Sequence, residues 1–180
     1  MRIIGGQYKG RRLNPPQLSL TRPTTDFARE ALFNILENNF DLEEVKFLDL
    51  FAGTGAISFE MASRGCSDIT LVENFEGCIS FIKKTVTELK TTAIKVLRAD
   101  VFRFIESSEQ QYDIIFADAP YKMPKLSSLP DLILQKNMLK ENGWLIVEHS
   151  LDNDFREHTN FVQQRKYGST IFAIFSANKT

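Results

Sequence analysis

The sequence has few of the residues that build disulfide-rich, metal-binding or membrane-spanning proteins. It contains two cysteines, Cys66 and Cys78, and two histidines in 180 residues. We expect two ordinary thiols and no metal, because neither a disulfide framework nor metal-ligand spacing is present. The apolar runs are far shorter than the roughly 20 residues of a transmembrane helix, and the first residues lack the apolar core of a secretory signal. We therefore expect a cytoplasmic protein that does not cross a membrane.

The chain also lacks a surplus of basic charge, which is the usual mark of a nucleic-acid-binding domain. Its formal net charge is −1. The charges are nevertheless unevenly distributed. Residues 1–30 carry six basic side chains against two acidic ones, a local excess of +4 that leaves −5 for the remaining 150 residues. The basic residues are Arg2, Lys9, Arg11, Arg12, Arg22 and Arg29. This pattern predicts either a basic edge that binds phosphate or a solvated surface arm.

After about residue 45, short apolar runs alternate with longer amphipathic stretches, which is typical of parallel strands joined by crossover helices. The predicted strands are Lys46–Leu50, Ile69–Glu73, Ile94–Leu97, Ile114–Ala117 and Trp144–Glu148, and the predicted helices are 56–64, 76–89 and 127–140. Two further strand-like runs, 163–167 and 170–176, flank Gly168-Ser169. They predict a C-terminal hairpin that gives the sheet an antiparallel edge.

The length of the chain suits one domain, 1–180, with residues 1–40 as a basic N-terminal extension. The extension begins with a β-prone piece, Arg2–Leu13, and continues through a proline-containing connection that includes Pro15 and Pro16. A helix is then predicted to start near Thr24-Thr25-Asp26, because these residues serve as N-caps.

A strand, a turn with two glycines and the start of a helix follow one another in Phe47-Leu48-Asp49-Leu50-Phe51-Ala52-Gly53-Thr54-Gly55-Ala56. Glycines permit the positive φ angles of a tight turn and let a ligand approach the backbone. The unpaired N–H groups at the start of the helix favour an electron-rich group. The dinucleotide fingerprint requires a third glycine where this chain has Ser58. The turn therefore predicts a ligand-binding corner without identifying the ligand.

Acidic residues mark the ends of the strands around this turn. Glu73 ends the second strand, where a carboxylate accepts hydrogen bonds from both hydroxyls of a ribose. Asp100 precedes Val101-Phe102, which suit an adenine amine and its ring. Asp49 requires a compensating partner inside the first strand, so it either holds the turn or faces an ammonium group. Each acid alone also suits a helix cap or a turn, but together they predict a ligand site.

The fourth strand ends in Asp118-Ala119-Pro120-Tyr121, which supplies a carboxylate, a carbonyl and an aromatic ring. These groups suit the exocyclic amine of a base, a poor nucleophile because its lone pair is delocalised. Asp118 and the carbonyl of Ala119 would accept its N–H groups, and Tyr121 would stack on the base. Asp118 would also receive the released proton, directly or through water. A simple type I turn is the alternative interpretation.

A distinctive series of residues opens the chain: Arg2-Ile3-Ile4-Gly5-Gly6, Lys9-Gly10-Arg11, and Arg22-Pro23-Thr24-Thr25-Asp26 leading into Arg29-Glu30-Ala31-Leu32-Phe33-Asn34. With this opening and the glycine turn, which many methyltransferases share, the chain resembles the bacterial guanine-N2 methyltransferases of 16S (small-subunit) ribosomal RNA over nearly its full length. The family usually has a second proline where this chain has Ala119. The carbonyl is retained, but the loop loses some stiffness.

The resemblance implies a Rossmann-like class I methyltransferase fold with a mostly parallel seven-stranded sheet. It also implies methyl transfer from S-adenosylmethionine, with S-adenosylhomocysteine as product, to a guanine amine at Asp118–Tyr121. The expected partner is ribosomal RNA, within the small subunit or an assembly intermediate, and we expect a monomer. The residues expected at the donor are Asp49, Phe51, Gly53, Thr54, Gly55, Glu73, Asn74, Asp100 and Val101. Charge and resemblance together place Arg2, Lys9, Arg11, Arg12, Arg22 and Thr24 at the RNA.

Other functions fit parts of the same pattern. A DNA adenine-N6 or cytosine-N4 methyltransferase shares the amine chemistry, although the chain is short for an additional target-recognition domain. A dinucleotide-dependent oxidoreductase is disfavoured by Ser58. A non-catalytic RNA-binding module with a degenerate cofactor pocket is the third alternative, with Ala119 as its sign of decay.

Overall fold

The computed structural model describes residues 1–16, 24–120 and 123–178. Its helices are α1 (Asp26–Glu37), α2 (Ala56–Ser63), α3 (Glu76–Leu89), α4 (Val101–Ser107) and α5 (Leu129–Gln135). Its strands are β1 (Lys46–Leu50), β2 (Asp68–Glu73), β3 (Ile94–Arg98), β4 (Tyr112–Ala117), β5 (Leu139–His149), β6 (Phe161–Tyr167) and β7 (Thr170–Ser176). Within the described part of the chain, no helix combines the length and the apolar composition needed to cross a bilayer.

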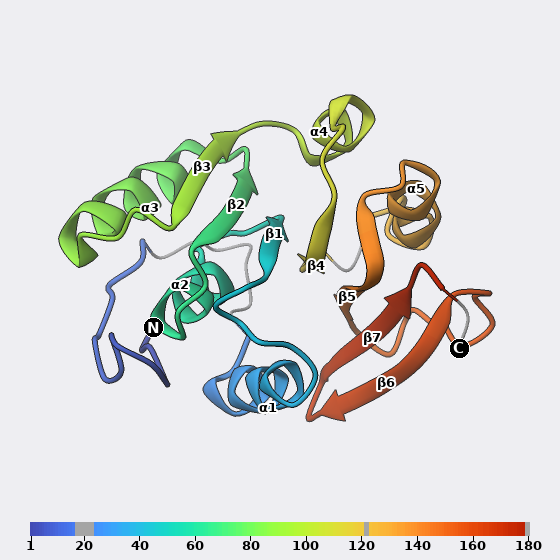
Figure 1. Cartoon of the computed structure of the whole chain (residues 1–180), viewed down its shortest axis with the longest axis horizontal. Helices are drawn as coiled ribbons and strands as arrows, with labels where there is room; N and C mark the ends of the chain where they lie inside the picture. Colours follow the sequence, from blue (N-terminus) through green and yellow to red (C-terminus); the bar gives the residue numbers. More distant parts are fainter. Residues whose placement is uncertain (17–23, 121–122, 179–180) are drawn as a thin grey trace.

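The strands form one seven-stranded sheet in the order β3-β2-β1-β4-β5-β7-β6 (Figure 1). β1 to β5 run parallel to one another, whereas β7 is antiparallel to both β5 and β6. The predicted mixed sheet with a C-terminal antiparallel hairpin is therefore confirmed. β1 pairs with β2 on one side and β4 on the other, so the strand order reverses there. Open α/β sheets bind ligands beside the carboxyl ends of strands at such a reversal.

Helices cover both faces of the sheet. Figure 1 shows α1, α2 and α3 on one side and α4 and α5 on the other. Alternate strand residues point to opposite faces: Phe47 belongs to the core cluster beneath α1, α2 and α3, and its neighbour Leu48 belongs to the cluster beneath α4 and α5. Both side chains are completely buried. Burial on both faces of the sheet thus explains why the strand sequences are apolar along almost their whole length.

Three local predictions differ from the structure. The helix expected over 127–140 ends at Gln135, because Asn137 adopts a φ of +52° and β5 already begins at Leu139. α4 has no counterpart among the predicted helices, since its seven residues are too few to reveal a helical period. The β-prone piece at the N-terminus forms a single antiparallel bridge, Arg2 with Arg12, rather than a longer strand.

The N-terminal segment folds back on itself and packs on α2. Its bridge is closed by hydrogen bonds between Ile3 and the backbone at Arg11 and Gly10. The buried carboxylate of Glu60 in α2 then accepts hydrogen bonds from the backbone N–H groups of Ile4 and Gly5, at 2.8 and 2.7 Å. These contacts hold the basic segment against the part of the chain that follows the glycine turn.

Candidate active site

A cavity of about 220 Å³ lies at the carboxyl ends of the central strands. Its lining contains residues that the sequence predicts for donor binding together with residues that it predicts for amine binding. Those from the donor set are Phe51, Gly53, Glu73, Asn74, Asp100 and Val101, and those from the amine set are Asp118 and Pro120. Phe102 and Met123 complete the lining. Residues from four separate loops therefore converge on one space.

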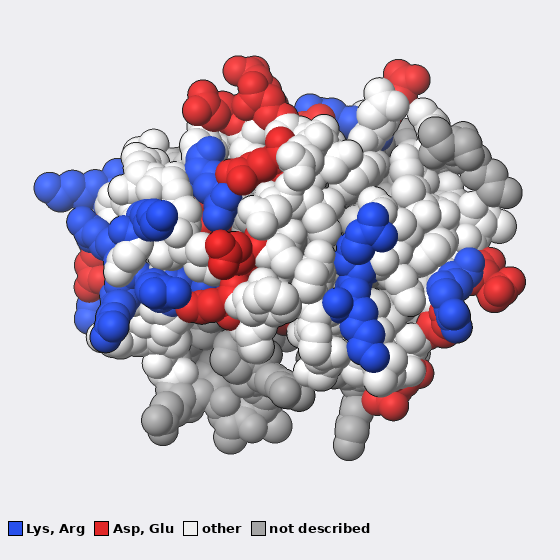
Figure 2. All heavy atoms as spheres, turned by 90° about the horizontal axis from the view of Figure 1, so that it is seen from below, with Lys and Arg blue, Asp and Glu red and all other residues white. Residues whose placement is uncertain are grey.

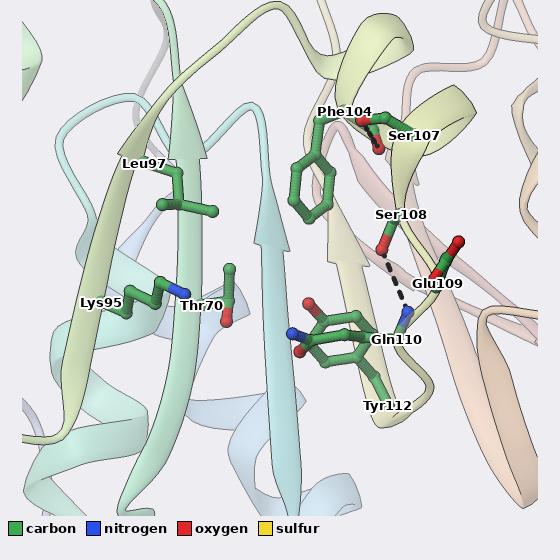
Figure 3. A pocket seen from close by; sticks show the side chains of 9 residues that line it. All are labelled: Thr70, Lys95, Leu97, Phe104, Ser107, Ser108, Glu109, Gln110 and Tyr112. Carbon is green, nitrogen blue, oxygen red and sulfur yellow. Dashed lines mark hydrogen bonds between the residues drawn. The ribbon is translucent and has the colours of Figure 1, made fainter.

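A larger hollow, of about 360 Å³, lies elsewhere, between β3 and the segment that joins α4 to β4. Figure 3 shows the rings of Phe104 and Tyr112 among its lining residues, with Thr70 and Lys95 on the neighbouring strands. None of the residues that line it belongs to the predicted site. The candidate active site is therefore the smaller cavity, on the basis of the groups that surround it.

The glycine turn has the backbone geometry that its sequence predicts. Gly53 and Gly55 adopt φ values of +55° and +74°, a region that disfavours residues with a side chain. A Cβ atom on Gly55 would also approach the ring of Phe59 to 3.1 Å. At Gly53 the nearest atom to an added Cβ is the Phe51 carbonyl oxygen, 4.0 Å away. Gly55 thus permits close packing of α2, whereas Gly53 borders the open space of the cavity.

Phe51 itself has a φ of +59°, which is uncommon for a residue with a bulky side chain. Such backbone conformations concentrate at binding sites, where surrounding contacts hold them. Here the ring of Phe51 contacts that of Phe102 edge-to-face, with 6.0 Å between centroids. The strained turn therefore places an aromatic ring in the lining of the cavity.

Glu73 is nearly buried and fixes the turn from the end of β2. One carboxylate oxygen accepts the N–H of Gly53 at 2.8 Å, and the other accepts the N–H groups of Asn74 and Phe75, each at 2.8 Å. A carboxylate can accept about four hydrogen bonds in total. Glu73 is therefore pre-positioned at the cavity with capacity for a ligand hydroxyl.

Asp49 lies in β1 beneath the cavity and is not part of its lining. Its Oδ2 accepts a hydrogen bond from the Ser58 hydroxyl at 2.6 Å, which ties β1 to the first turn of α2. Burial raises the pKa of Asp49 to about 7, against the lowering effect of the Ser58 hydrogen bonds. The observed partner of Asp49 is thus in α2, and both predicted roles, holding the turn and facing an ammonium group, stay predictions.

The remaining donor-set residues have distinct positions. Asp100 caps α4 by accepting the N–H of Arg103 at 3.0 Å through Oδ1, so its other oxygen can accept a hydrogen bond from a ligand. Thr54 contacts the sulfur of Met1 through its hydroxyl at 3.8 Å. Gly55 and Thr54 lie in the turn but do not line the cavity.

Asp118 follows β4, and its N–H donates to the carbonyl of Leu50 at the end of β1, at 3.4 Å. This bond places the carboxyl beside the glycine turn. Ala119 is buried and Pro120 is exposed at the cavity. Tyr121 and Arg22 lie outside the described residues, so their predicted roles remain predictions.

Three carboxyl groups lie on one face of neighbouring strands here: Asp49, Asp118 and Glu148. Ala117 pairs with Val147 in the register of β4 and β5, so Asp118 and Glu148 come next to each other beyond that pair. Burial raises the pKa of Asp118 well above its usual range, and the negative charges of Glu148 and Asp49 raise it further. A carboxylate whose pKa is raised accepts a proton more readily than an ordinary carboxylate does.

Comparison with known proteins assigns the chain to a family. The family described as "Conserved hypothetical protein 95" matches residues 1–176. Ribosomal RNA small subunit methyltransferase D of Escherichia coli K12 is 34% identical over 148 residues, covering 82% of this chain and 71% of that protein. YlbH of Bacillus subtilis is 36% identical over 182 residues, covering 97% of this chain and 98% of that protein. The chain belongs to the RsmD/YlbH family of S-adenosylmethionine-dependent methyltransferases.

Solved structures agree with this assignment. A hypothetical protein of Thermus thermophilus, 26% identical, superposes with a TM-score of 0.86 over 98% of this chain and 99% of that one. Precorrin-6y C5,15-methyltransferase of Geobacter metallireducens, only 14% identical, has a TM-score of 0.70 over 91% of this chain and 93% of that one. The latter likeness concerns the fold alone, which is the class I methyltransferase fold.

The predicted RNA residues form an exposed group on the N-terminal segment. The side chains of Arg2, Lys9, Arg11 and Arg12 are exposed, and Figure 2 shows basic side chains gathered on the side of the molecule where the N-terminal segment lies. Thr24 differs, because its hydroxyl donates to the Glu148 carboxylate at 2.8 Å. The predicted RNA set is thus divided between an outer basic surface and a contact beside the acceptor end of the cavity.

The sequence did not indicate the roles of three residues in or near this site. Ser58, which the sequence presents only as a broken fingerprint, is the partner of Asp49. Glu60 and Glu148 are buried carboxylates on a helix and a strand. No local pattern separates Glu60 from surface acids. Glu148 directly follows the apolar run 145–147, and this position was the available signal, since burial of a carboxylate requires partners.

Proposed function

We propose that this chain transfers the methyl group of S-adenosylmethionine to the exocyclic N2 amine of a guanine in small-subunit ribosomal RNA. The observation that carries the proposal is that Asp118 and Pro120 line the same cavity as Gly53, Glu73 and Asp100. Residues suited to the donor and residues suited to a planar amine therefore share one space. The RNA substrate is supported by relatives named as small-subunit ribosomal RNA methyltransferases.

The lining of the cavity fits a nucleoside-containing methyl donor. Glu73 has capacity to accept a ribose hydroxyl, Asp100 has a free oxygen for an adenine amine, and the ring of Phe102 can pack against the base. Gly53 leaves room for the donor beside the backbone. When bound, S-adenosylmethionine supplies an electrophilic methyl group on a positively charged sulfur.

Asp118 and the carbonyl of Ala119 orient the guanine amine by accepting its N–H groups. Two acceptors help to localise the nitrogen lone pair, which the base otherwise delocalises. Asp118 in its ionised form then takes the proton that nitrogen must lose, directly or through water. Because the methyl group is already reactive, orientation of the amine supplies much of the acceleration.

The decisive experiment is transfer of labelled methyl from S-adenosylmethionine to unmodified small ribosomal subunits, naked ribosomal RNA and DNA, followed by nucleoside analysis. We expect label in N2-methylguanosine. Label in methylated DNA bases would replace the proposal with a DNA methyltransferase, and no label despite measured donor binding would favour a non-catalytic module.

A further inference from the structure

A pair of aromatic side chains, the exposed Phe27 and the half-buried Tyr167, distinguishes the first turn of α1 from the rest of that helix. The other apolar residues of the α1 core face, such as Ala28, Leu32 and Phe33, are completely buried. Phe27 is 69% exposed and contacts Tyr167 of β6 edge-to-face, with ring centroids 5.9 Å apart and an interplanar angle of 79°. Burial in the core therefore does not account for a phenylalanine at this position.

This aromatic pair is connected to the acceptor end of the cavity by a short series of contacts. Thr24, three residues before Phe27, donates to one oxygen of Glu148 at 2.8 Å. Thr170, the cross-strand partner of Tyr167, donates to the other oxygen of Glu148 at 3.4 Å. Glu148 in turn neighbours Asp118 across β4 and β5. The aromatic pair is thus connected to the place proposed for the target amine through these contacts.

A basic side chain accompanies the aromatic pair. Arg165 is exposed two residues before Tyr167 in β6, which puts both on the same face of the strand, whereas Lys166 between them lies on the opposite face. Figure 2 shows a stripe of basic side chains over the β6–β7 hairpin, bordered mostly by uncharged surface, in addition to the basic group of the N-terminal segment. An exposed aromatic ring beside an arginine is a combination that binds unpaired bases and their phosphates.

We propose that Phe27 and Tyr167 form a stacking platform for an unpaired RNA base next to the target guanine, with Arg165 at the adjoining phosphate. The proposal rests on the RNA substrate proposed above. Specific RNA recognition generally engages bases that have left the helix, because their faces can then stack on aromatic rings. A base held by the platform would keep the neighbouring guanine near Asp118 without contacting the methyl donor.

The test uses the full-length protein and compares Phe27→Ala with Phe27→Trp and Phe27→Leu. Binding of small-subunit ribosomal RNA is measured at several salt concentrations, together with the KM and kcat of methyl transfer. We expect Phe27→Ala to raise both the Kd and the KM for RNA about tenfold, as loss of one stacked base requires. The kcat, the affinity for S-adenosylmethionine and the salt slope should stay unchanged, and Phe27→Trp should retain wild-type affinity.

Arg165→Ala provides the matched contrast. Loss of a phosphate contact should reduce the salt slope by about 1, whereas Phe27→Ala should leave that slope intact. Equal RNA affinity of Phe27→Ala and the unsubstituted protein would overturn the platform, and so would full rescue by Phe27→Leu, which restores apolar bulk without an aromatic face. Neither result contradicts the proposed function, provided that the unsubstituted protein methylates the RNA. Absence of RNA binding by the unsubstituted protein would overturn both proposals.

Discussion

Asp118 lies among groups that disfavour its ionised form, and its protonation should therefore control the rate. Burial and the charges of Glu148 and Asp49 raise its pKa, while the ionised form is the one that accepts a proton from the amine. Activity is expected to increase with pH as Asp118 ionises. Glu148→Gln removes one of the negative charges, so the pKa of Asp118 should fall and the pH–rate profile should move to lower pH.

Thr24→Val is the control for this shift, because it removes the hydrogen bond to Glu148 but leaves the charge. Its pH–rate profile for kcat should match that of the unsubstituted protein. An unshifted profile in Glu148→Gln would mean that Glu148 acts only in packing. The test separates an electrostatic role from a structural one because a structural defect lowers activity equally across the pH range.

Asp49 also affects the stability of the fold. Its pKa is raised to about 7 in the folded protein, from a usual value of 3.8. Below both values Asp49 is protonated in the folded and unfolded chains alike, so no penalty applies. As the pH rises from about 4 to about 7, the unfolded chain ionises first and the free energy of unfolding falls, by up to roughly 4 kcal/mol. Denaturant unfolding of Asp49→Asn between pH 4 and 8 should lack this fall, and an unchanged pH dependence would contradict the assignment.

At the scale of elements, the N-terminal segment depends on a close approach to α2 at Gly6. A Cβ atom there would lie 1.7 Å from the carbonyl oxygen of Ser63, a distance that forces the segment away. Gly10 also has a positive φ, +83°, but nothing lies within 4 Å of an added Cβ. Gly10→Ala should therefore cost only the backbone strain of about 1–2 kcal/mol, and Gly6→Ala should cost more. Limited proteolysis of residues 1–16 and thermal unfolding of both variants measure the difference; equal effects would mean that the contact with Ser63 is unimportant.

The strands can be predicted because their sequence patterns extend over several residues. The residues that hold the site and the N-terminal segment in place have no such pattern. Apolar runs such as that of β1 are long enough to be recognised, and the glycines of the turn reveal a requirement for positive φ. The docking of the N-terminal segment depends instead on Glu60, a buried residue whose partners are 55 and 56 positions away in sequence. Likewise, the role of Ser58 is recognised only when the structure shows its hydrogen bond to Asp49. Such long-range pairs leave no local period in the sequence.

At the scale of the whole molecule, the proposed RNA surface joins the basic N-terminal segment to an otherwise acidic body. Arg11→Ala with Arg12→Ala should weaken RNA binding and reduce the magnitude of the salt slope by about 1–2, as expected for two lost phosphate contacts. Lys83→Ala serves as the control, because this exposed residue belongs to α3 and not to the N-terminal segment. An unaltered slope in the double variant would make the segment a solvated arm rather than an RNA contact.

The central claim is that donor and target amine meet in the cavity between Glu73 and Asp118. The most direct measurement compares Asp118→Ala with the unsubstituted protein in two assays, the Kd for S-adenosylmethionine and the single-turnover rate of methyl transfer to small-subunit RNA. The account predicts loss of transfer with a donor Kd within about twofold of the original, because a group that contacts only the amine contributes little to donor binding. Loss of donor binding together with transfer would contradict the claim, since Asp118 would then maintain the structure of the cavity rather than orient the amine.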